Sequence, residues 1–164
     1  MESASLKVKK EESSNSPVNT AAGADIAENA KIEDFRQMAK AAADKFAQIG
    51  KSETIRLVSH LDADGLSSAS IMVKALLREN RKYCLSIVPQ LTEEVAMQLA
   101  AESYSHYIFT DLGTGQFDIL KKNLSDNGKS LFILDHHHLQ KEFAAENIVH
   151  VNPHLAGIES SREI

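Results

Sequence analysis

From Thr54 onward the sequence alternates between short β-branched or apolar segments and longer segments with helical periodicity. The strand-like segments are residues 54–59, 83–88, 106–110, 130–134 and a short one at 147–151. The helix-like segments are residues 66–81, a segment that starts at Thr92, and residues 117–127. Strands that alternate with helices of about 10 to 15 residues form βαβ units. The sequence therefore predicts an α/β fold with a mostly parallel sheet and helices on both faces.

The region before Thr54 is expected to contribute a tail and one helix. Residues 1–24 mix Ser, Asn, Lys, Glu and Ala without an apolar period, which predicts a disordered tail. Residues 25–50 predict an amphipathic helix because these apolar side chains recur at helical spacing: Ile32, Phe35, Met38, Ala39, Ala42, Phe46 and Ile49. Asp25 and Glu28 have capping-box spacing, and Gly50 is placed to end the helix. We expect it to pack on the following domain, with a coiled-coil partner helix as the alternative.

The composition is typical of one globular domain, with 164 residues, 43% hydrophobic and 25% charged. No run approaches the roughly 18 to 20 apolar residues of a membrane span, and the N-terminus is too polar for a secretory signal. We therefore expect a cytoplasmic location and no membrane partner. The single cysteine, Cys84, cannot form an internal disulfide, which agrees with a reducing compartment. The net charge of -5 argues against a broad basic surface for nucleic acid.

Polar side chains follow three of the predicted strands at the point where each strand ends. They are His60, Asp62 and Asp64 after the first strand, Asp111 after the third, and Asp135, His136, His137 and His138 after the fourth. The second strand ends in Pro89-Gln90 and adds none. Ligands of open parallel sheets bind beyond the carboxyl ends of the strands, which meet at one edge. The sequence therefore predicts a shared site at this edge.

Each cluster also has an interpretation of its own. A solvated His-rich loop would explain residues 135–138, and a helix N-cap would explain Asp111. An EF-hand loop over residues 60–71 is disfavoured, because His60 would stand at position 1 and Ile71 at position 12, where a bidentate Glu is needed. A dinucleotide-binding fold is disfavoured because no G-x-G-x-x-G follows the first strand. Three clusters at one edge favour a common site over three separate explanations.

The ligand types indicate which metal the site would take. Asp and His without Cys select hard to borderline divalent cations, so Mn²⁺ is preferred, or Mg²⁺, over a structural zinc. Two cations that share a bridging carboxylate would lower the pKa of a water and hold a phosphoryl oxygen. The sequence thus predicts two divalent cations and the hydrolysis of a phosphoester.

The sequence resembles the DHH phosphoesterases, which are named for the triplet found here as Asp135-His136-His137. It is most similar to their RecJ-like single-strand exonuclease branch. That branch also has an Asp-x-Asp-Gly loop, matched by residues 62–65, and an isolated Asp after the third strand, matched by Asp111. The resemblance covers about residues 50–155 and implies a Rossmann-like DHH domain.

The resemblance also implies roles for the matched residues. The expected metal ligands are Asp62, Asp64, Asp111, Asp135, His136 and His60. Asp111 would bridge both cations, and His136 would bind one of them. His137 would face the scissile phosphate, so His137 and Asp111 are the expected catalytic residues. His138 has no role that the resemblance assigns.

The implied function is exonucleolytic hydrolysis of single-stranded DNA or RNA, with replication or repair proteins as further partners. The alternatives are a small-substrate phosphoesterase, acting on nanoRNA, a cyclic dinucleotide or a nucleoside bisphosphate, and a non-catalytic replication scaffold. In the family, a further metal-binding Asp and a second domain follow the triplet. The chain stops at Ile164, so residues 51–164 are interpreted as a DHH domain that is incomplete at its C-terminus.

Overall fold

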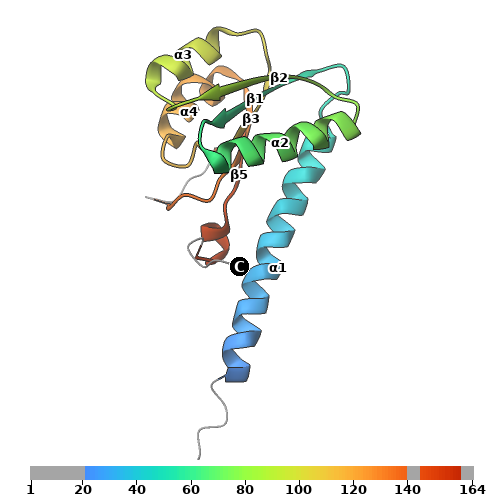
Figure 1. Ribbon diagram of the computed structural model, residues 1–164, viewed down its shortest axis with the longest axis vertical. Coiled ribbons are helices and arrows are strands. Elements are labelled where there is room, and N and C mark those ends of the chain that lie inside the picture. The colour runs from blue at the N-terminus through green and yellow to red at the C-terminus, as the bar shows by residue number, and fades with distance from the viewer. Residues whose placement is uncertain (1–20, 140–144, 160–164) are drawn as a thin grey trace, which may run out of the picture.

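The computed structural model describes residues 21–139 and 145–159, which form one sheet covered by helices (Figure 1). The five strands are β1 (Thr54–His60), β2 (Lys82–Val88), β3 (His106–Thr110), β4 (Ser130–Leu134) and β5 (Ile148–Val151). Their order in the sheet is β2-β1-β3-β4-β5, and every neighbouring pair is parallel. The predicted α/β fold is confirmed, and the described sheet is parallel throughout.

Helices lie on both faces of the sheet, as the sequence predicts. The helices are α1 (Ala21–Ala47), α2 (Ala63–Arg78), α3 (Glu93–Ala101) and α4 (Phe117–Asn123), with short 3-10 turns η1 (Ser125–Asn127) and η2 (Pro153–Ala156). Side chains of α1 and α2 pack with Ile55 and Leu57 on one face. Side chains of α3 and α4 pack with Val58 on the other. The inner strands β1, β3 and β4 are mostly apolar because both of their faces are buried.

The order of the strands creates a topological switch point between β1 and β3. The chain leaves β1, passes through α2 to β2 at the edge, and returns through α3 to β3 on the other side of β1. Because both crossovers are right-handed, α2 and α3 must lie on opposite faces. The chain that leaves the carboxyl end of β1 enters α2 on one face, whereas the chain that leaves the carboxyl end of β3 enters α4 on the other, so these two connections diverge. Ligands bind at such a switch point in open α/β sheets.

The N-terminal helix begins earlier than predicted. It starts at Ala21 instead of residue 25, so Asp25 lies within the helix and cannot be its N-cap. The Asp25 side chain and residues 1–20 lie outside the described residues, and the predicted disordered tail stays a prediction. The first half of α1 projects away from the sheet in Figure 1, while its last turns pack on it through Ala42 and Phe46.

A buried arginine holds the end of α1 against the sheet. Arg81, between α2 and β2, donates from Nη1 to Ile49 O at 2.9 Å, and its guanidinium lies 4.5 Å from the centre of the Phe46 ring. A cation at this place interacts favourably with the carbonyl end of the helix dipole.

No helix in the described ranges is both long and apolar enough to cross a bilayer.

Candidate metal centre

The carboxyl end of β1 brings a histidine and an aspartate together. His60 Nδ1 lies 2.9 Å from Asp62 Oδ2 and 3.8 Å from Asp111 Oδ2. His60 Nε2 lies 3.1 Å from Pro89 O, and a carbonyl can only accept, so Nε2 carries the hydrogen. In the neutral ring, Nδ1 then presents a lone pair to two carboxylates. Lone pairs and carboxylates that face one another require a proton or a cation between them.

Two buried acceptor atoms at this point, His60 Nδ1 and Asp111 Oδ2, receive no hydrogen bond from a donor among the described residues. Unpaired polar atoms in a protein interior cost free energy and call for an explanation. One ligand atom from each of His60, Asp62 and Asp111 lies within 4.8 Å of the other two. The donor set therefore fits a divalent cation that prefers oxygen and nitrogen ligands.

Asp111 belongs to a second group of candidate ligands as well. Its Oδ1 lies 3.1 Å from His136 Nε2, and it groups with Asp135, His136 and His137 within 4.8 Å. The residue has φ +59, a left-handed conformation that costs an ordinary side chain about 1 kcal/mol or more. Its N–H donates to Leu134 O at 3.0 Å, which continues the β3–β4 ladder. Asp111 thus stands between the two groups, as a bridging carboxylate would.

The protein favours the charged form of Asp62 but opposes that of Asp111. Burial raises the pKa of Asp111, and the adjacent Asp62 carboxylate raises it further. By contrast, the Gly65 N–H, which donates to Asp62 Oδ1 at 2.9 Å, lowers the pKa of Asp62. Bound cations would favour the ionised form of both acids.

The Asp-x-Asp loop ends in Gly65 because there is no room for a Cβ at this position. A Cβ built at this position would lie 2.2 Å from His60 O, a backbone atom that cannot move aside without displacing β1. The close approach lets Ser59 Oγ contact Gly65 O at 2.8 Å and Thr110 O at 3.0 Å. The first turn of α2 is thereby fixed against the ends of both strands that carry the ligands.

Asp135 is positioned differently from Asp111. Its Oδ1 accepts from His136 N at 2.8 Å and from His137 Nδ1 at 2.6 Å, with His137 N at 3.3 Å, and its Oδ2 accepts from Thr114 N at 2.9 Å. Although burial opposes ionisation, these donors hold the pKa of Asp135 below its ordinary range. Each oxygen accepts at least one hydrogen bond from the protein, so Asp135 orients the loop that carries His136 and His137, and its role as a metal ligand stays a prediction.

His137 is held by one ring nitrogen and open at the other side. Its Nδ1 contacts Asp135, while 57% of its side chain is exposed. Burial of part of the ring lowers its pKa, but the Asp135 carboxylate outweighs this and raises the pKa of His137. Pairing Nδ1 with a carboxylate fixes the orientation of the ring and leaves Nε2 for another partner.

A buried polar network beneath this loop was not predicted from the sequence. Asn152, fully buried after β5, donates from Nδ2 to His137 O at 2.9 Å and to Thr114 Oγ1 at 3.2 Å. Thr114 Oγ1 also lies 3.0 Å from His150 Nε2, and burial lowers the pKa of His150. The sequence signal that could have drawn attention to Asn152 is Asn152-Pro153, an N-cap residue followed by proline at the first position of a helical turn. In the structure Asn152 Oδ1 accepts a hydrogen bond from His154 N.

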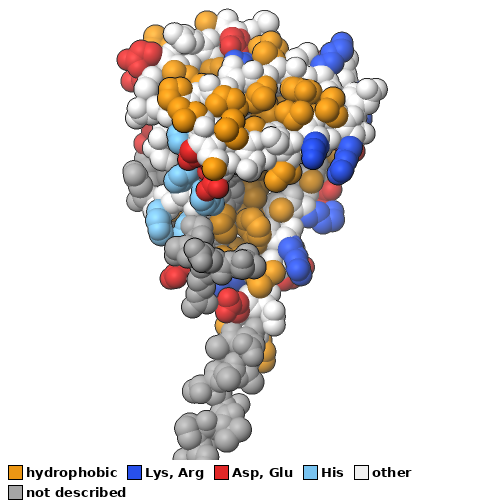
Figure 2. Space-filling view, in the orientation of Figure 1, with side chains coloured by type: hydrophobic (Ala, Val, Ile, Leu, Met, Phe, Trp, Pro, Cys, Tyr) orange, Lys and Arg blue, Asp and Glu red, His pale blue; other side chains and the backbone are white. Residues whose placement is uncertain are grey.

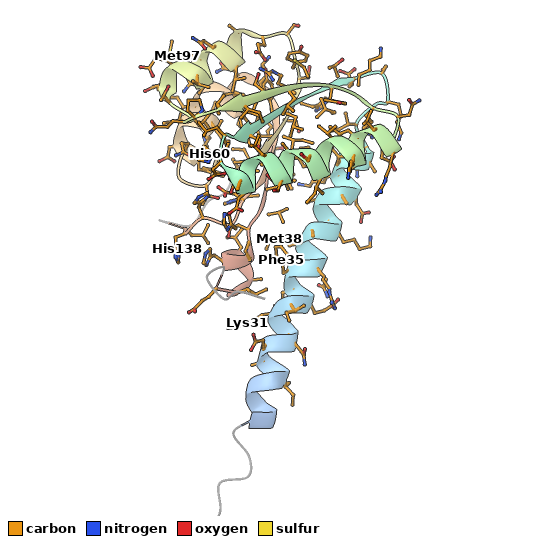
Figure 3. All side chains as sticks on the ribbon, viewed as in Figure 1. Lys31, Phe35, Met38, His60, Met97 and His138 are labelled. Atoms are coloured by element: carbon orange, nitrogen blue, oxygen red, sulfur yellow. The ribbon has the colours of Figure 1, made fainter. Side chains whose placement is uncertain are left out.

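Two predicted residues lie apart from these groups. Asp64 occupies the first turn of α2, is exposed, and belongs to neither group of candidate ligands within the described residues. Its role as a metal ligand therefore stays a prediction. His138 stacks on His154 with ring centres 4.5 Å apart. Figure 3 shows His60 beside the first turn of α2 and His138 nearer to η2, outside both groups.

Solved structures with similar folds include two RecJ proteins. RecJ from Thermus thermophilus in complex with Mn²⁺ gives a TM-score of 0.53 with 24% identity, over 71% of this chain and 16% of that one. The exonuclease RecJ bound to manganese gives a TM-score of 0.56 with 24% identity, over 69% of this chain and 30% of that one. At this identity the likeness concerns the fold.

Sequence comparison identifies the family. An uncharacterized protein of Methanocaldococcus jannaschii is 37% identical over 140 residues, which cover 82% of this chain and 31% of that protein. The chain thus spans less than a third of the length of these relatives. Residues 54–164 match the profile described as "DHH family, N-terminal domain". The chain therefore belongs to the DHH family.

Proposed function

We propose that this chain carries the metal-binding part of a metal-dependent phosphodiesterase, and that it acts as a RecJ-like exonuclease on single-stranded DNA or RNA. The observation that supports this most strongly is Asp111, whose two oxygens face different histidines in two adjoining ligand groups. A carboxylate shared in this way is the usual bridge of a two-metal hydrolytic site.

The ligands would divide between two divalent cations, with Mn²⁺ preferred. His60 and Asp62 would hold one, His136 the other, and Asp111 both, with Asp64 as a further ligand. Such cations polarise a phosphoryl oxygen and lower the pKa of a water. Two manganese-bound RecJ structures of the same fold support the choice of metal.

The chain's own residues would orient the phosphate. Asp135 holds the His137 ring through Nδ1, so the exposed side of the ring can donate from Nε2 to a phosphate oxygen. The Asp135 carboxylate favours the protonated ring, which suits a group that stabilises negative charge. Asn152 fixes the His137 backbone from below, so the ring and the metal ligands keep one geometry. Replication or repair proteins as partners stay a prediction.

Calorimetry and a nuclease assay test the proposal together. The chain is expected to bind Mn²⁺ and to shorten end-labelled single strands, whereas Asp111→Asn should weaken Mn²⁺ binding by at least about tenfold and abolish hydrolysis. Asp34→Asn is the matched control, because Asp34 is an exposed acid on α1, away from both ligand groups. Equal Mn²⁺ binding by all three proteins would refute the metal centre. Mn²⁺ binding without hydrolysis of any strand would contradict exonuclease activity of this chain by itself and favour a scaffold.

A further inference from the structure

The strand β2 lies at the edge of the sheet and is paired on one side only. β2 pairs with β1 along all seven of its residues, and no other strand of the described ranges pairs with it. Its outer backbone N–H and C=O groups therefore lack a partner strand. Proteins normally blunt such edges with proline, a bulge or several charges. β2 contains no proline, and its single charged residue is Lys82 at its first position.

Hydrophobic side chains lie beside this edge. Figure 2 shows them gathered in a band over β2 and α2. On β2, Leu85 and Ile87 are each 38% exposed, and they share the face of the sheet that α2 covers, because their partners on β1 are Leu57 and Ser59. On α2, Leu66 is 49% exposed and Leu77 is 60% exposed. We call these four side chains and the free edge of β2 the β2 surface.

The geometry of α2 places its exposed leucines on the β2 side. Residues 66, 70, 73 and 77 follow one stripe of the helix. The opposite flank, with Met72 and Ala75, lines an apolar groove toward α1. Because the helix runs back between β1 and β2, Leu66 lies near the end of β2 and Leu77 near its beginning. The stripe contains Ser70 and Val73 besides the leucines, and no charge.

We propose that the β2 surface is a dimer interface, in which β2 pairs antiparallel with β2 of a second copy of this chain across a two-fold axis. Pairing about Leu85, the middle residue of β2, would put Lys82 opposite Val88 of the second copy. The two lysines would then lie about 20 Å apart, so like charges do not oppose the contact. The nearly uncharged surface offers nothing to the phosphates of a nucleic acid or to a charged partner, but it is complementary to itself.

The mass of the full chain in solution tests this proposal. Light scattering after gel filtration is expected to give twice the 18.0 kDa of one chain. The double variant Leu85→Lys with Ile87→Lys should halve that mass by placing four charges in the interface. Met97→Lys is the matched control: Met97 is 58% exposed on α3, on the opposite face of the sheet (Figure 3), and should leave the dimer intact.

Hydrogen exchange on the wild-type chain provides a measurement that does not depend on folding of a variant. Amides of β2 should become more protected as the protein concentration rises, while those of α3 stay unchanged. A wild-type mass of 18.0 kDa at every concentration would overturn the proposal. So would a folded double variant that keeps the dimer mass, or concentration-dependent protection outside β2 and α2.

Discussion

Replacing Asp135 with asparagine tests whether Asp135 orients the loop that carries His136 and His137 or binds the metal directly. The substitution keeps the shape of the side chain but removes its charge and converts one acceptor oxygen into an NH₂ donor. In the best orientation the amide oxygen faces His136 N and His137, and the NH₂ then faces the N–H of Thr114, which is 1% exposed. One hydrogen bond to a charged acceptor is lost and a buried donor is left without a partner.

The expected cost follows from these contacts. A hydrogen bond to a charged group contributes about 1.5 to 3 kcal/mol, and an unsatisfied buried donor costs a similar amount, although the two overlap. We therefore expect Asp135→Asn to lower the free energy of unfolding by about 3 kcal/mol in urea denaturation. Asp126→Asn, which removes an exposed acid paired with Lys121, should change it by less than about 0.5 kcal/mol.

Mn²⁺ affinity provides the second readout. If Asp135 acts only on the loop, calorimetry at a temperature where the variant is folded should show an Mn²⁺ affinity about 10- to 100-fold below wild type, as for other residues that orient a metal ligand, and a smaller loss than in Asp111→Asn. A loss as large as that of Asp111→Asn would show that Asp135 binds metal directly, as the sequence predicts. An unchanged free energy of unfolding would refute the hydrogen-bonding argument.

Two further substitutions test other parts of the structure. Arg81→Met should lower the free energy of unfolding in urea by about 2 to 3 kcal/mol, because Arg81 is 5% exposed and donates to the carbonyl groups that follow α1. The control Arg78→Met, at an exposed arginine, should have almost no effect. Equal effects of the two substitutions would contradict this role of Arg81. Burial lowers the pKa of His106 below its unfolded value of about 6.5, so the unfolded state binds more protons than the folded state. The stability that neutral His106 contributes at higher pH is therefore lost as the pH falls below about 6.5. The wild-type loss of stability between about pH 7.5 and about pH 5.5 should therefore shrink in His106→Gln, and an unchanged loss would contradict the assignment.

The sequence predicts the strands and the shared edge because both depend on local pattern. Strands buried on both faces must be apolar, and parallel strands must release their next residues at one edge, which places Asp62, Asp111 and His136 near one another. The start of α1 escaped prediction because residues 21–24 carry no capping signal that separates them from the tail. The helix continues there through sequence that is rich in alanine, which favours helix without marking its beginning.

The network under the loop escaped prediction for another reason. Asn152 and Thr114 are 38 residues apart, and their contact exists only because β5 lies next to β4 while the loop after β3 reaches across both. Neither residue belongs to a motif with known ligand chemistry. Their importance follows from burial and hydrogen bonding, which the order of the strands determines.

Asp111 and Asp135 show how two similar sequence positions acquire different chemistry. Each is the first residue after its strand, and the last residues of these strands, Thr110 and Leu134, are paired in the sheet. After β4, the backbone turns around the Asp135 carboxylate and presents the N–H groups of His136 and His137 to it. After β3, Asp111 takes a left-handed conformation, and none of the backbone N–H groups described donates to its Oδ2. The charge of Asp135 is therefore compensated by donors within the protein, whereas Asp111 Oδ2 has no such donor, so the direction of the backbone gives the two acids different surroundings.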